Sequence, residues 1–212
     1  MSDEPDVDPV ELEAQLSQIK SAMGIDERYE GATTQWLLYG FLVPIAAAAS
    51  QYVHLQELPG LYHPVIWVGV LFGGGFVGSW LWAGTDAENA STTTDGKPSL
   101  WFIFVAVYLS TFPLLFVVFR FTDGLGYDAQ NALILGVALV MVGVAYLIEA
   151  NVLRAYYIRS RDRYALYVGG ILLVALGVAI ATVDTLWSWG YAVFGALYFV
   201  YAMAAYVVLT RT

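Results

Sequence analysis

The sequence contains no cysteine and only two lysines, and both features narrow the chemistry open to the protein. Without cysteine there is no disulfide framework, thiolate metal site, iron–sulfur cluster or cysteine nucleophile. Neither lysine, Lys20 or Lys97, lies in a long apolar run, which excludes a retinal Schiff base. Charged residues make up 13% of the chain, against about 25% in a typical soluble domain. The composition therefore lies outside the soluble class.

Long apolar runs take up most of the chain after residue 33. They cover residues 36–54, 64–83, 100–119, 132–152, 164–183 and 187–209. A helix needs about 20 residues to cross the hydrocarbon core of a bilayer, and backbone groups in that core must be satisfied within the segment. The alternating polarity of a membrane β-barrel is absent from these runs. The sequence predicts an all-α, polytopic protein of the cell membrane, with six transmembrane helices within residues 34–212.

The basic residues predict how this bundle is oriented, because Lys and Arg near the ends of spans stay on the cytoplasmic side. With the N-terminus inside, eight of the nine basic residues are cytoplasmic and only Arg120 is outside. The opposite orientation would reverse that distribution. We therefore expect a multi-pass protein with both termini in the cytoplasm.

Residues 1–33 form an acidic segment that carries nine acids against Lys20 and Arg28. Such a segment is not expected to bind nucleic acid, because both are polyanions. The acidity, the scarcity of lysine and the abundance of Ala, Val and Gly are typical of a membrane protein from a halophilic archaeon. An ordinary acidic tail is the alternative interpretation.

A short amphipathic helix is predicted over residues 8–24 within this segment. Asp8 suits the N-cap, Pro9 the first helical position and Gly24 the C-cap. One apolar stripe has heptad-like spacing and is formed by Leu12, Leu16, Ile19 and Met23. We expect this stripe to bind a protein partner. Self-pairing, contact with the membrane surface and packing on the protein's own cytoplasmic loops remain open.

Few residues in or near the spans suit catalysis or metal binding. Glu149 is the one carboxylate within a predicted span, which makes it a candidate ion or proton ligand; pairing with a loop arginine is the structural alternative. His54, Glu57 and His63 are weak candidates for a metal site, without a known ligand spacing. Hydrolase signatures are absent, so we expect neither an enzyme nor a resident cofactor.

The second predicted span is rich in glycine, at Gly69, Gly73, Gly74, Gly75 and Gly78. Glycines four residues apart let a second helix approach the backbone closely. They predict either a homo-oligomer interface or a flexible gate, while packing within the molecule is the alternative.

The leading hypothesis is a non-catalytic accessory, scaffold or signalling subunit that acts through partner contacts. It follows from a chemically plain bundle joined to a striped cytoplasmic helix. The competing hypothesis is a small channel or transporter for an ion or small solute. Its path would lie near the glycines of the second span and near Pro44, Ser110, Thr111 and Pro113.

Overall fold

The computed structural model describes residue 15 and residues 31–77, 100–122, 124–153 and 160–210. The chain divides into two compact units, Met1–Glu30 and Gly31–Thr212. Within these described ranges every regular element is a helix. The elements of the second unit are α2 (Gly31–Leu55), α3 (Tyr62–Val68), the π-helical turn η1 (Gly69–Gly73), α5 (Leu100–Phe121), α6 (Tyr127–Val152), α7 (Ser160–Thr182), the short 3-10 helix η3 (Asp184–Leu186) and α8 (Gly190–Thr210).

Four of these helices are long and apolar enough to cross a membrane: α2 over Trp36–Leu55, α6, α7 and α8. Shorter apolar helical stretches cover Tyr62–Val77 and Leu109–Phe121. The prediction of an all-helical chain suited to a membrane is therefore confirmed at the level of four candidate spans.

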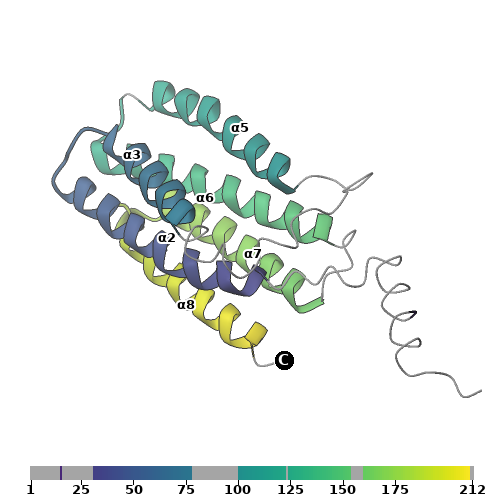
Figure 1. Cartoon of the computed structure of the whole chain (residues 1–212). Helices are drawn as coiled ribbons and strands as arrows, with labels where there is room; N and C mark the ends of the chain where they lie inside the picture. The colour runs from purple at the N-terminus through teal and green to yellow at the C-terminus, as the bar shows by residue number, and fades with distance from the viewer. Residues whose placement is uncertain (1–14, 16–30, 78–99, 123, 154–159, 211–212) are drawn as a thin grey trace, which may run out of the picture. The chain divides into compact units, whose positions relative to one another are not determined.

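The long helices pack as two antiparallel pairs, α2 with α8 and α6 with α7 (Figure 1). In the first pair, a Cβ atom built at Gly40 would lie 2.7 Å from Met203 Cε, and one built at Gly195 would lie 2.9 Å from Ala47 Cβ. The missing side chains let the two helices approach each other closely.

The contact between α6 and α7 is closer still, because glycines face each other on both helices. A Cβ atom built at Gly136 would lie 2.6 Å from the carbonyl oxygen of Gly177, and one built at Gly143 would lie 2.8 Å from that of Gly170. The reciprocal positions are equally tight. These two glycine pairs lie two turns apart on each helix, so they set the separation of α6 and α7 over those two turns.

The remaining helices lie against this four-helix arrangement. The segment formed by α3 and η1 packs on α2, and α5 packs on α6 (Figure 1). The buried core joins α2, α6, α7 and α8 through residues such as Val43, Leu139, Leu173 and Phe194.

Several predicted helix boundaries differ from the structure. The first and fifth helices begin earlier than residues 36 and 164, at Gly31 and Ser160. The fourth apolar run was expected to become helical at residue 132, whereas α6 begins at Tyr127, because a polar first turn ahead of the run also adopts helix. The last helix was expected to begin at residue 187, whereas α8 begins at Gly190 after a turn at residues 187–189. Tryptophans in that turn extend the apolar run without belonging to the helix, as interfacial aromatic residues do.

Several predicted features lie outside the described residues. They include the predicted amphipathic helix over residues 8–24 and its apolar stripe, since Gln15 is the one described residue of that range. Gly78 and the end of the second apolar run also lie outside the described residues.

Candidate functional site

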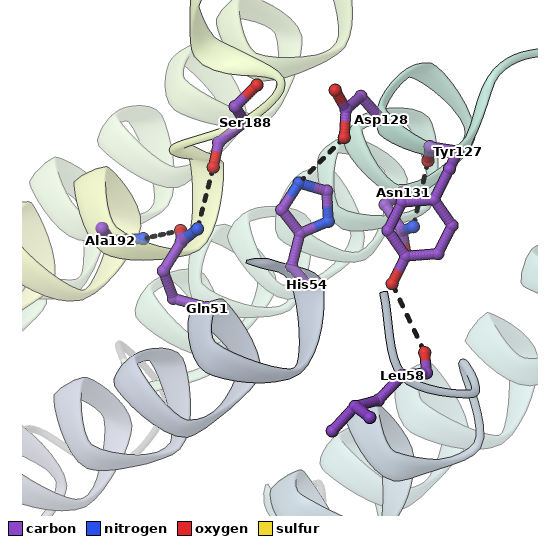
Figure 2. Close-up of polar contacts among 8 residues, drawn as sticks. All are labelled: Gln51, His54, Leu58, Tyr127, Asp128, Asn131, Ser188 and Ala192. Atoms are coloured by element: carbon purple, nitrogen blue, oxygen red, sulfur yellow. Dashed lines mark hydrogen bonds and ion pairs between the residues drawn. The ribbon is translucent and has the colours of Figure 1, made fainter. Parts of the chain in front are cut away.

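Polar side chains gather where four segments meet at one end of the bundle. The last turn of α2, the start of α3, the first turn of α6 and the first turn of α8 contribute to this cluster. Figure 2 shows the contacts of His54 with Asp128 and of Gln51 with the start of α8. Since α2 ends here and α6 and α8 begin here, the cluster occupies one common end of three of the candidate spans. We call it the histidine cluster, defined by His54, His63, Tyr127, Asp128 and Tyr191.

His54 links α2 to α6. Its Nε2 lies 3.3 Å from Asp128 Oδ1, and its ring stacks on that of Tyr127 with centroids 5.3 Å apart. The hydroxyl of Tyr127 donates to the carbonyl oxygen of Leu58 at 3.4 Å, which ties the loop after α2 to the same corner (Figure 2). The imidazole of His54 is almost fully buried, whereas the Asp128 side chain is 55% exposed, so one partner of this contact is accessible.

His63, just ahead of the second predicted span, lies on the other side of Tyr191. The two rings stack with centroids 4.9 Å apart and planes within 8° of each other, and His54 approaches the same tyrosine at 6.2 Å. Although His63 is only 9% exposed, neither of its ring nitrogens has a hydrogen-bond partner among the described residues. A neutral imidazole ring has one nitrogen that can donate a hydrogen bond and one that can accept.

Gln51 holds the start of α8 from the facing helix. Its Nε2 donates to the carbonyl oxygen of Ser188 at 2.8 Å, and its Oε1 accepts from the backbone N–H of Ala192 at 3.0 Å (Figure 2). The first N–H groups of a helix have no partner within the helix, and here a side chain from another helix supplies one. Gln51 is 6% exposed and acts as an N-cap across the helix interface.

Glu57 has a left-handed backbone conformation. Its φ is +49°, and it follows α2 in a turn where Glu57 N–H donates to His54 O and Leu58 N–H donates to Val53 O. This pattern is the Schellman motif, in which the left-handed residue is usually glycine. The described residues include no group of three or more His, Cys, Asp or Glu that could hold a metal ion. The weak candidates His54, Glu57 and His63 accordingly do not form a three-ligand site.

Glu149, the candidate ion or proton ligand, is at the opposite end of α6 from the histidine cluster. It occupies the last turn of α6 and is half-buried, and no ion pair joins it to another described residue. Two of the arginines expected near it, Arg154 and Arg159, lie outside the described residues.

The glycines of the second apolar run divide into two faces. A Cβ atom built at Gly74 would lie 2.5 Å from Leu42 Cδ2, and one at Gly75 would lie 3.4 Å from the Tyr39 hydroxyl, so these two pack on α2. Nothing lies within 4 Å of a Cβ atom built at Gly69 or Gly73. The first pair fits packing within the molecule, and the second pair leaves an open face on η1.

Sequence reasoning did not identify Gln51 or Tyr191 as members of a site. Gln51 looks like an ordinary polar residue near a helix end, and Tyr191 looks like one of many interfacial aromatics. A buried amide only two turns from the middle of an apolar run was a signal, because such a group needs a partner. No known protein family, curated protein or solved structure matches the chain.

Proposed function

We propose that this chain is a six-span protein of the cell membrane that acts as a non-catalytic accessory subunit, by binding a protein partner through its cytoplasmic side. The observation that carries the proposal is the use of polar side chains to join helices of the described bundle to one another.

Four contacts illustrate this use. Gln51 joins α2 to α8, and His54 joins α2 to α6. The hydroxyl of Tyr201 on α8 donates to the carbonyl oxygen of Ala165 on α7 at 2.6 Å, and the hydroxyls of Tyr146 and Tyr198 lie 2.9 Å apart between α6 and α8. Hydrogen bonds of this kind fix the relative position of helices. A rigid bundle suits a scaffold that presents a cytoplasmic segment.

The path of the chain supports six crossings. Because His54 in the last turn of α2 meets Asp128 in the first turn of α6, the stretch between them leaves and returns at one end of the bundle. That stretch holds two apolar helical regions, Tyr62–Val77 and Leu109–Phe121, and two further crossings through them satisfy this requirement. With the basic residues inside, both termini are then cytoplasmic.

Native mass spectrometry after gentle extraction from the source membranes tests the subunit proposal. We expect a second protein at fixed stoichiometry with the full chain, and its loss from a variant lacking residues 1–30. A matched variant with Leu12→Gln and Leu16→Gln keeps the length and net charge but disrupts the predicted stripe, and should lose the same partner. A bare monomer or homo-oligomer from the full chain contradicts the proposal.

A second candidate function, a small channel or transporter, is favoured by the π-helical turn η1 in the glycine-rich segment. Such turns occur frequently at functional sites. The proposed hydroxyl groups of its path are used locally: Ser110 and Thr111 both donate to the carbonyl oxygen of Val107, at 2.9 and 2.7 Å.

Solute and ion flux in liposomes distinguishes this second candidate. A transport role predicts flux with the full chain that survives deletion of residues 1–30. It also predicts a change in flux for Gly73→Leu, because the position is open and the substitution need not disturb packing on α2. Liposomes without flux under ion and solute gradients contradict the transport role.

A further inference from the structure

A groove of about 410 Å³ runs between α2 and α8. It is lined by Pro44, Ala48, Gln51, Tyr191, Ala192, Gly195, Ala196 and Phe199. Its volume lies within the range of small-molecule sites, roughly 300–1,000 Å³. Ala48, Ala196 and Phe199 are exposed on the outside of the helix pair, so the groove faces the surroundings of the bundle.

The polarity of the groove changes along its length. Gln51 and Tyr191 lie at the end where α2 finishes and α8 begins, while Pro44 and Phe199 lie about 10 Å further along the helices. The floor between them consists of small residues, which leave room for a narrow chain. The site is thus polar near the helix ends and apolar toward the middle of two candidate spans.

The polar end has hydrogen-bonding capacity beyond its structural contacts. A glutamine amide carries two N–H donors and two acceptor lone pairs. The bonds of Gln51 to Ser188 and Ala192 use one donor and one lone pair. These two bonds leave one N–H of the Gln51 amide unused.

We propose that this groove binds a single hydrocarbon chain of a bilayer lipid, with the linkage oxygens of that lipid at Gln51 and the chain extending toward Phe199. An empty groove at this depth would leave its lining without van der Waals contacts, and hydrocarbon is the filler that the bilayer core supplies. A lipid also has the same order of polarity as the groove, from its linkage at the interface to its chain in the core. The inference depends on the membrane embedding of the proposed function and not on a protein partner.

Photo-crosslinking in liposomes tests this inference. The full chain is reconstituted with phosphatidylglycerol that carries a diazirine in one acyl chain, and labelled residues are mapped by mass spectrometry. We expect labelling concentrated on Ala48, Ala192 and Phe199. Ala196→Trp, which fills the groove, should lower that labelling severalfold.

Ala204→Trp is the matched control, because Ala204 is also an exposed alanine of α8 but does not line the groove. It should leave the labelling of the groove unchanged. Uniform labelling of all exposed helix faces would overturn the inference, since the groove would then hold only bulk lipid. Crosslinked dimers joined through Ala196 with an unlabelled groove would overturn it in favour of a second copy. An absence of labelling anywhere on α2 and α8 would instead contradict the membrane embedding itself.

Discussion

His54 and Asp128 approach within 3.3 Å, Nε2 to Oδ1, and this contact fixes the end of α2 beside the beginning of α6. The proposed membrane embedding therefore requires an even number of crossings between these residues. The hydrogen bond from the Ala192 N–H to Gln51 Oε1 likewise holds the beginning of α8 beside the end of α2. The histidine cluster consequently lies at a single end of the bundle, where three long helices meet.

The glycine pairs of α6 and α7 predict a steep cost of added volume. Gly136→Ala should lower the free energy of unfolding by about 1–3 kcal/mol, because the new Cβ atom would lie 2.6 Å from the Gly177 carbonyl oxygen and the helices must move apart. Gly69→Ala is the control, since nothing lies within 4 Å of its Cβ position. Thermal unfolding in detergent measures both. Equal stability of the two variants would contradict the close contact.

The cap that Gln51 provides to α8 predicts a cost of about 1–3 kcal/mol for Gln51→Leu. The side chain keeps a similar volume, but the Ala192 N–H and the Ser188 carbonyl lose their partner in a buried place. Gln130→Leu serves as the control, because the contacts of Gln130 are long, at 3.3–3.5 Å. Hydrogen exchange at Ala192 should rise in the first variant only. Unchanged exchange there would argue against the cap.

The left-handed conformation of Glu57 predicts that glycine is preferred at this position. Glu57→Gly should raise the free energy of unfolding by about 0.5–1 kcal/mol, since a φ of +49° strains any residue with a Cβ atom. Glu57→Ala keeps the strain while removing the carboxylate, and should give no such gain. If both substitutions stabilise equally, the carboxylate and not the backbone is responsible.

The six apolar runs all correspond to helical segments where the structure describes them, because a long apolar run in a membrane protein has few alternatives to helix. The contacts between helices were harder to predict. The four-residue spacing of Gly69 and Gly73 predicts a close contact between helices at these two glycines. The closest backbone contacts instead join Gly136 to Gly177 and Gly143 to Gly170.

A seven-residue spacing of glycines on both α6 and α7 was the signal for these contacts. It places two glycines on one face of each helix, two turns apart. Which helix lies opposite depends on tertiary packing, and hydropathy carries no information on that choice. The same limit applies to the histidine cluster, whose members come from four separate segments.

Cysteine labelling gives the most direct test of a six-span bundle with both termini inside, because the native sequence contributes no background thiol. Single variants Gln56→Cys, Thr185→Cys, Ser2→Cys and Thr93→Cys are treated in intact cells with a membrane-impermeant maleimide. The account predicts labelling at positions 56 and 185, and labelling at positions 2 and 93 only after the cells are permeabilised. Labelling of position 93 in intact cells would show that residues 64–119 do not cross the membrane, and would contradict the six-span account.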